Sequence, residues 1–289
     1  MHITCAALWA GLAVVMMLPA QALVILGFNS EKHNRFAWGW PLTPAPNESV
    51  NFIGVGYDWS GVAWDAKADQ TYLNVAMISS QYFVYAAHRP PSTNLNFFSP
   101  ILRSVVSYTW SGSGITLKDP QTNVDSDFAV GKLNNPLDPA HGIATYPIFS
   151  LGSDPSLYVG LTSFTYGRES SSGQGPRIGR DVAAGFEHLD LRPYNNPDET
   201  LDTIAVYHIY TSDGPTDSTY YQSGDSNSPL FVPHGGRLSI LGTHSAVGES
   251  SGTFYSYDNF IPVYLDQMRT LGIEFTTVPE PASIGSAFL

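Results

Sequence analysis

Short alternating runs separated by turn residues constrain the fold of this chain more than any other feature of its sequence. Val106, Tyr108 and Trp110 alternate with Ser107 and Thr109, and a Ser-Gly-Ser-Gly turn follows at once. Successive side chains of a strand point to opposite faces, so an alternation with a period of two residues is typical of a β-strand. The chain also has 26 glycines and 21 prolines to make turns, and the pattern predicts an all-β protein.

Further apolar or alternating runs predict more strands along the chain. They lie at residues 73–78, 82–86, 157–161, 164–166, 204–210, 230–232, 238–241 and 252–257. Many short strands separated by turns are typical of a β-barrel or a β-sandwich. The aromatic content supplies a core for either architecture, because the chain has 6 Trp, 16 Tyr and 15 Phe.

One helix is predicted close to the C-terminus. From Ile261 to Leu271, apolar side chains recur every three or four residues, which places them on one face of a helix. Asp258 or Asn259 can cap its first turn, and Gly272 follows its end. The predicted fold class is therefore all-β with a C-terminal helix.

The first 22 residues predict export of the protein. They contain no Lys, Arg, Asp or Glu, and they end in Ala-Gln-Ala at residues 20–22, which fits a signal-peptide cleavage site. Cleavage there would leave 289 − 22 = 267 residues without a cysteine, because Cys5 is the only one. The alternative is a buried N-terminal helix. After residue 22, no segment of the sequence is long and apolar enough to span a membrane.

The charge of the chain excludes one class of partner. Lys and Arg total 13, and Asp and Glu total 25, so the formal net charge is −12. Nucleic-acid binding needs cationic side chains against the phosphates, so we expect no nucleic-acid partner.

The sequence predicts no metal site and no cofactor. Four histidines lack the spacing of metal ligands and are interpreted as structural or surface residues: His141, His188, His208 and His234. The acidic loop at residues 195–202 offers oxygen ligands for Ca²⁺, but a solvated loop is the interpretation we favour.

Three residues of types that act together in catalysis lie at predicted strand ends or turns. His88 follows a buried-looking strand, Asp127 opens an apolar run, and Ser226 lies in a Gly- and Ser-rich turn. A serine becomes an effective nucleophile when a base lies within hydrogen-bond reach and a third group orients that base. Residues so far apart in sequence can meet only through the fold.

The strings around these residues resemble the signatures of the trypsin/chymotrypsin family of serine proteases. Tyr-Ala-Ala-His ending at His88 is similar to T-A-A-H, Asp-Phe-Ala-Val starting at Asp127 to D-[IL]-A-[LV], and Gly-Asp-Ser-Asn-Ser-Pro around Ser226 to G-D-S-G-G-P. The order His, Asp, Ser and the spacings 127 − 88 = 39 and 226 − 127 = 99 match as well. The resemblance covers roughly residues 50–275. It implies two antiparallel six-stranded β-barrels with a C-terminal helix, in an exported bacterial protein.

The resemblance implies a role for each matching residue. Ser226 would be the nucleophile of a serine endopeptidase, His88 its general base and then its general acid, and Asp127 the group that orients His88. The backbone N–H groups of Gly224 and Ser226 would form the oxyanion hole. Asp125 is the rival of Asp127 for the orienting role. The partner implied is a protein or peptide substrate.

Two substitutions depart from the family pattern and support an alternative. Asn227 and Ser228 stand where the family has two glycines. The alternative is a catalytically inactive pseudoprotease that acts as an extracellular binding or surface module. A third hypothesis is an unrelated β-sandwich surface protein. The oligomeric state is not predicted.

In the family, the residue that matches Asp225 pairs with a new N-terminal amine. Two segments of this chain are candidates to supply that amine. They are residues 23–27, which signal cleavage would free, and residues 51–54.

Tyr220, His244 and Ser245 are candidate substrate-binding residues. Tyr220 lies six positions before Ser226, where an Asp selects Arg or Lys in trypsin-like enzymes, and Asp217 is close by. Gly-Thr-His-Ser at residues 242–245 resembles glutamyl endopeptidases, in which a histidine meets an acidic substrate side chain. The alternative is that His244 is a core residue and that the pocket accepts apolar side chains.

The tail completes the predicted organisation. Residues 278–283 resemble the PEP-CTERM sorting motif of exported bacterial proteins, without the membrane helix and basic cluster that follow it in that family, and the alternative is a flexible tail. We expect a secreted or cell-envelope protein. The predicted parts are a signal peptide (1–22), an irregular lead-in (23–50), an N-terminal barrel (51–139), a C-terminal barrel with the helix (140–275) and a PEP-CTERM-like tail (276–289).

Overall fold

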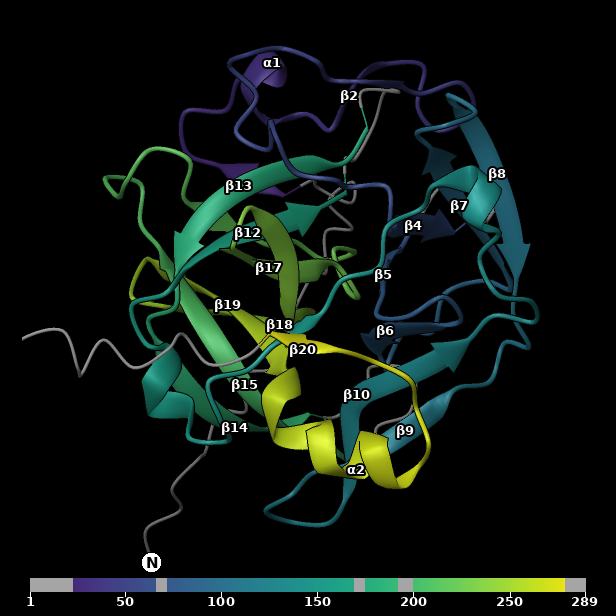
Figure 1. Ribbon diagram of the computed structural model, residues 1–289. Coiled ribbons are helices and arrows are strands. Elements are labelled where there is room, and N and C mark those ends of the chain that lie inside the picture. The colour runs from purple at the N-terminus through teal and green to yellow at the C-terminus, as the bar shows by residue number, and fades with distance from the viewer. Residues whose placement is uncertain (1–22, 66–71, 169–174, 192–199, 279–289) are drawn as a thin grey trace, which may run out of the picture.

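Two β-barrels lie side by side in the computed structural model, which describes residues 23–65, 72–168, 175–191 and 200–278 (Figure 1). The segment that carries α1 and β2 lies at one end of the molecule, and α2 lies at the opposite end. The predicted signal peptide, most of the acidic loop and residues 279–289 of the predicted tail lie outside the described residues. Within the described residues, no helix is long and apolar enough to cross a membrane.

The first barrel is a closed ring of six strand positions. Its strands are β4 (Val62–Asp65), β5 (Asn74–Met77), β6 (Tyr82–Ala86), β7 (Asn94–Ser99), β8 (Ser104–Thr109), β9 (Ile115–Lys118) and β10 (Asp125–Lys132). Their antiparallel order is β10-β6-β5-β4-β7-β8. The ring closes because β9 pairs with β10 and because a bridge joins Trp110, just after β8, to Leu133. We therefore count β8 and β9 as one bent strand.

The second barrel closes in the same way. Its strands are β12 (Thr162–Gly167), β13 (Arg177–Val182), β14 (Gly185–Leu191), β15 (Leu201–Tyr210), β17 (Pro229–His234), β18 (Arg237–Ser250) and β19 (Thr253–Phe260). Their order is β13-β12-β17-β18-β19-β15, and β14, which continues β13 after two alanines, pairs with β15 along its whole length. The predicted all-β fold with two antiparallel six-stranded barrels and a C-terminal helix is confirmed.

The remaining elements are short. They are β1 (Val24–Ile25), α1 (Ser30–His33), β2 (Phe36–Trp38), β3 (Ala45–Pro46), β11 (Ile148–Phe149), β16 (Thr219–Tyr220), β20 (Thr277–Val278), α2 (Leu265–Thr270) and the 3₁₀ helices η1 (Pro139–His141), η2 (Pro155–Tyr158) and η3 (Ile261–Tyr264). In the lead-in, β1 pairs with β16 of the second barrel and β2 pairs with β3.

The predicted strand at residues 157–161 is wrong. The structure has the 3₁₀ helix η2 at its start instead. Pro155 fits the first turn of a helix because it lacks an N–H, and the side chain of Asp154 accepts a hydrogen bond from Ser156 N–H. This local capping outweighs the apolar character of the run.

The C-terminal helix has a different start from the predicted one. It begins as η3 at Ile261 after Phe260, with no side-chain cap, and continues as α2. Asp258 and Asn259 belong to β19, so the predicted cap is wrong. Gly272 follows α2 with φ +69°, a left-handed conformation that glycine adopts without strain.

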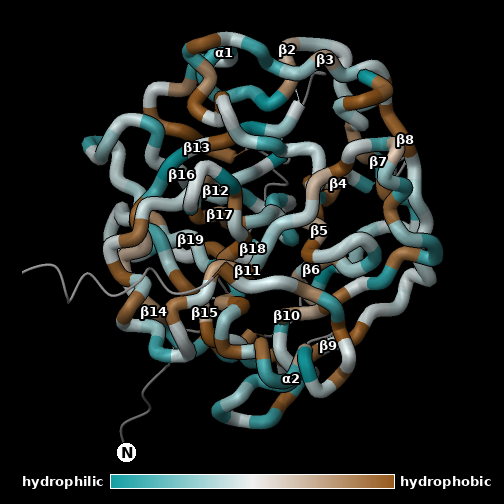
Figure 2. Tube along the Cα trace, in the orientation of Figure 1, coloured by the Kyte–Doolittle hydropathy of each residue, from teal (hydrophilic) through white to brown (hydrophobic). Residues whose placement is uncertain are grey.

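Several strands have apolar residues at consecutive positions, without polar alternation, because each of their two faces packs against a different core. On β6, Phe83 and Tyr85 point into the core of the first barrel, whereas Val84 points into the core shared by the two barrels and α2. On β10, Ala129 points into the core of the first barrel and Phe128 points into the shared core. Hydrophobic residues accordingly recur along the strands of both barrels (Figure 2). This double burial fixes the strand ends that carry the polar residues described below.

A buried arginine ties the lead-in to both barrels. Arg35 is 4% exposed, and its guanidinium donates to Trp59 O at 2.6 Å, Val62 O at 2.9 Å and Tyr166 Oη at 2.7 Å. Val62 belongs to the first barrel and Tyr166 to the second. One rigid fork of donors therefore satisfies acceptors on both sides of the interface.

We predict that Arg35→Lys lowers the free energy of unfolding by about 2 kcal/mol or more, because a lysine keeps the charge but cannot reach all three acceptors. Urea denaturation measures the change. The control is Arg269→Lys, because Arg269 is 55% exposed and pairs with an exposed Asp266, and the expected change there is under about 0.5 kcal/mol. Equal midpoints for Arg35→Lys and the parent protein would contradict the prediction.

Candidate active site

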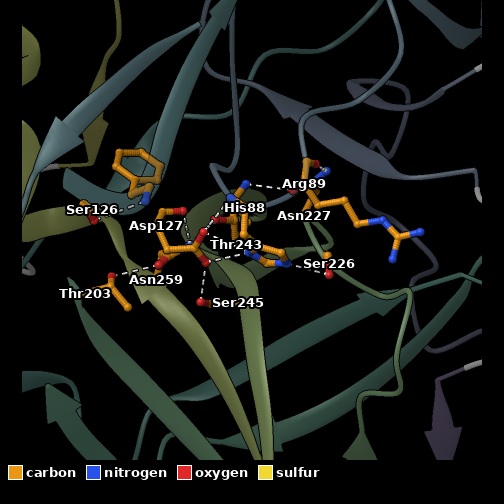
Figure 3. Close-up of polar contacts among 12 residues, drawn as sticks. His88, Arg89, Ser126, Asp127, Thr203, Ser226, Asn227, Thr243, Ser245 and Asn259 are labelled. Carbon is orange, nitrogen blue, oxygen red and sulfur yellow. Dashed lines mark hydrogen bonds and ion pairs between the residues drawn. The ribbon is translucent and has the colours of Figure 1, made fainter. Parts of the chain in front are cut away.

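The three side chains predicted to act together, those of His88, Asp127 and Ser226, lie next to one another (Figure 3). His88 follows β6, and Asp127 lies near the start of β10, so both come from the first barrel. Ser226 lies in the turn that precedes β17 of the second barrel. The fold thus brings together side chains that are 138 residues apart in the sequence.

The His88 imidazole bridges the other two side chains. Its Nδ1 lies 2.8 Å and 3.0 Å from the carboxylate oxygens of Asp127, and its Nε2 lies 3.0 Å from Ser226 Oγ. A carboxylate only accepts hydrogen bonds, so Nδ1 carries the proton and Nε2 is left to accept from the serine hydroxyl. This is the geometry that a base needs in order to remove the hydroxyl proton.

The carboxylate of Asp127 is fully buried and held by several donors. Besides the imidazole, the backbone N–H of His88 donates to Oδ1 at 2.8 Å, and the hydroxyl of Ser245 donates to Oδ2. The backbone carbonyl of Asp127 accepts from Ala87 N–H at 2.8 Å and from the Asn259 side-chain amide at 3.0 Å. Both the position and the orientation of the carboxylate are therefore fixed.

Asp125, the rival for the orienting role, has a different partner from the imidazole. It forms an ion pair with Lys118 at 2.6 Å, and both side chains are half exposed. Of the two aspartates, only Asp127 contacts His88.

Two opposing effects set the pKa of His88. Burial lowers the pKa, but the charge of Asp127 and the hydrogen bond to it raise the pKa by more, and nearby Arg89 lowers it slightly. The pKa of His88 therefore lies above its ordinary value of 6.5. The imidazole is protonated at low pH and becomes an effective base once the pH exceeds this raised value.

The turn that carries Ser226 has the conformation of a nucleophile turn. Gly224 has φ +105°, a backbone conformation that strongly favours glycine, and a Cβ there would also require the Arg168 guanidinium to move. Ser228 N–H donates to Asp225 O at 3.0 Å. Within the described part of the chain, the N–H groups of Gly224 and Ser226 have no acceptor. The described residues therefore leave both donors of the predicted oxyanion hole without an acceptor.

The substitutions at Asn227 and Ser228 fit this turn without disrupting it. Asn227 is fully buried with φ +73°, and its side chain contacts Ala86 N and Arg89 O on either side of His88. The Ser228 hydroxyl is buried and has no hydrogen-bond partner among the described residues. Neither residue moves Ser226 away from His88.

Asp225 is buried behind the turn. Its carboxylate accepts from Arg168 N–H at 2.9 Å and from Gln222 N–H at 2.8 Å, yet burial raises its pKa to about 7. Of the two candidate amine segments, the one that begins at Leu23 lies alongside, because Leu23 is buried and its N–H donates to Arg168 O at 3.3 Å. Asn51 of the other segment is exposed.

Two of the residues considered for the substrate pocket have partners within the protein. Tyr220 packs against Phe254 with ring centroids 4.7 Å apart. Asp217 is bound by Lys32 and by His33, whose Nε2 lies 3.0 Å from Asp217 Oδ1. The Asp217 carboxylate is therefore already neutralised by α1.

His244 lies in the interior, as expected under the alternative that it is a core residue. It is 3% exposed, and its ring stacks on Tyr221 with centroids 3.9 Å apart. Burial lowers the pKa of His244 to about 3, so the ring is uncharged. Ser245, the third candidate, directs its hydroxyl at Asp127.

The other histidines have structural contacts. His141 Nδ1 lies 2.6 Å from Tyr108 Oη, and His188 lies 3.3 Å from Asp119. His208 is buried between Ser163 and Asp258, and His234 packs against Phe149. Among the residues that the structure describes, no group of three or more His, Cys, Asp or Glu side chains is arranged to hold a metal ion.

Three contacts of the site carry no signal in the sequence. They are the hydroxyl of Ser245 on Asp127, the amide of Asn259 on the Asp127 carbonyl, and the amide of Asn227 on the turn around His88. Each joins residues more than 100 positions apart, so only the fold shows them.

Comparisons with known proteins identify the fold. No family model matches the chain, and no curated protein matches it. Among solved structures, human heparin binding protein aligns with 76% of this chain and 94% of its own, with a TM-score of 0.51 and 14% identity. A mutant of the same human protein aligns with 76% of this chain and 95% of its own, with a TM-score of 0.50 and 15% identity. The chain therefore has the chymotrypsin-like β fold. At this identity, the likeness shows the fold alone.

We predict that Asp127→Asn lowers the pKa of His88 to below 6.5. The substitution removes the charge that raises the pKa, while burial, which lowers it, remains. NMR titration of the imidazole measures the change. Asp125→Asn is the matched control, because Asp125 pairs with Lys118 and not with His88, and it leaves the titration unchanged. A titration that is the same in Asp127→Asn and the parent protein would show that Asp127 does not control the imidazole.

Proposed function

We propose that this protein is a serine endopeptidase that hydrolyses peptide bonds through Ser226, His88 and Asp127. One observation carries the proposal: Ser226 Oγ lies 3.0 Å from His88 Nε2 while the other ring nitrogen is bound by a buried carboxylate. A histidine with a purely structural role would not need a serine hydroxyl at its second ring nitrogen. The combination of hydroxyl, imidazole and buried carboxylate is therefore best explained by catalysis.

The geometry supports acyl transfer in two stages. The hydroxyl oxygen of Ser226 attacks the carbonyl carbon of the scissile peptide bond while His88 Nε2 takes its proton, and the Gly224 and Ser226 N–H groups bind the oxyanion. His88 then gives the proton to the departing amine, and an acyl-enzyme remains. Water, deprotonated by His88, attacks the acyl carbon and releases the acid, and the proton returns to Ser226.

The pseudoprotease alternative rests on Asn227 and Ser228. The alternative loses its main support because both residues fit the turn and leave Ser226 at hydrogen-bond distance from the base. The binding activity named for the similar human protein is not proposed for this chain. Heparin is a polyanion, and a chain with a net charge of −12 would repel it.

The proposed partner is a protein or peptide substrate outside the cytoplasm, with no nucleic acid involved. Export is proposed from the sequence of residues 1–22, and the PEP-CTERM-like sequence at residues 278–283 supports a secreted or cell-envelope location.

We predict that Ser226→Ala lowers kcat on a casein substrate by about 10⁴-fold or more, since the nucleophile is lost while substrate binding remains. A fluorophosphonate probe should label the parent protein and not the variant. Ser223→Ala is the matched control, because Ser223 lies in the same turn with its side chain exposed. Hydrolysis by Ser226→Ala at the parent rate would rule out the proposed nucleophile.

We predict cleavage after neutral, mainly apolar side chains. Tyr220 stands at the position where trypsin-like enzymes have a selective Asp, Asp217 is neutralised by Lys32 and His33, and His244 is uncharged and covered. Peptides that differ only in the residue before the scissile bond test this. Preferred cleavage after Arg or Lys would contradict it, and so would cleavage after Glu that His244→Ala abolishes.

A further inference from the structure

We infer that Asn227 is a positioning residue that holds the turn of His88 against the turn of Ser226. The inference rests on the proposed function, because it concerns how the same site keeps its geometry. Asn227 directly follows Ser226 in the chain, and its side chain reaches across to the first barrel (Figure 3).

Both ends of the histidine turn are bound by this one side chain. Ala86 to Arg89 form a tight turn in which Arg89 N–H donates to Ala86 O at 3.1 Å. Asn227 Oδ1 accepts from Ala86 N–H at 2.8 Å, and Asn227 Nδ2 donates to Arg89 O at 2.7 Å. Within the turn, the N–H groups of Ala87 and His88 donate to Asp127. Every N–H from residue 86 to residue 89 is thereby satisfied.

Only an amide of this length meets both requirements. The N–H at one end of the turn needs an acceptor and the carbonyl at the other end needs a donor, and a neutral carboxamide offers one of each. An Asp at position 227 would turn a carboxylate oxygen toward the carbonyl of Arg89 and lose the donor. A glycine would leave both backbone groups without this partner in a buried place.

The backbone of Asn227 suits the same task. Its φ of +73° lies in the left-handed region, which asparagine adopts more readily than most residues with a side chain. Its N–H donates to His244 O at 3.1 Å, so the main chain is anchored to β18 of the second barrel. A fully buried residue that is fixed to both barrels keeps Ser226 and His88 in register.

Two variants of Asn227 and one matched control test the inference. Asn227→Gly accepts the backbone angle but removes the amide, and Asn227→Asp keeps the shape but removes the donor. Ser228→Gly is the control, because Ser228 lies in the same turn and its buried hydroxyl has no partner in the described structure. Urea denaturation of each variant verifies that it is folded. The readouts are kcat and KM on a peptide substrate and the low-field ¹H NMR signal of the His88 Nδ1–H bound to Asp127.

We expect kcat to fall about 10- to 100-fold in both Asn227 variants, with KM changed less than about twofold, because a misplaced base slows the chemistry and not the binding. The His88 signal should broaden or disappear in both, and Ser228→Gly should match the parent protein. The inference would be wrong if Asn227→Gly kept both the parent kcat and the His88 signal. If the glycine variant does not fold, the same result in Asn227→Asp would overturn the inference. A parent protein that shows the signal without hydrolysis would overturn the proposed function, while the signal in the variants still decides the role of Asn227.

Discussion

The buried carboxylate of Asp127 is the constraint on which the rest of the site depends. A charge removed from water costs several kcal/mol unless donors surround it, and here donors come from both barrels. His88 supplies two from the first barrel, and Ser245 supplies one from β18 of the second. The carboxylate is satisfied only when the barrels are docked, so the same contacts that stabilise the interface also orient the imidazole.

The barrels provide rigid strand ends, and the chemistry lies on the turns that follow or precede them. Strands such as β6 and β10 are buried on both faces, so their register cannot slip without exposing apolar side chains. The turn of Ser226 leads directly into β17, whose first four residues are buried. Because such strands anchor the turns, Ser226 Oγ and His88 Nε2 stay 3.0 Å apart although they belong to different barrels.

Much of this arrangement is visible in the sequence. Period-two alternation marks most strands, and the strings around His88, Asp127 and Ser226 mark the residues that meet, because each string is local and has a characteristic composition. What the sequence does not show is how remote segments complete one another. The contact of Ser245 with Asp127 and the bridge from Asn227 depend on the relative position of two barrels. Local competition explains the other errors, as at η2, where a proline and an aspartate cap outweigh an apolar run.

The buried guanidinium of Arg35 has a consequence for motion. Two packed domains can move about a hinge, as in proteins whose domains close around a ligand. Such a hinge would separate the guanidinium of Arg35 either from its carbonyl acceptors or from the phenol of Tyr166. It would leave a partly unpaired cation beside aromatic rings, including that of Phe36, whose centroid lies 4.6 Å away. The barrels should therefore move as one body, and thermal unfolding should be a single cooperative transition.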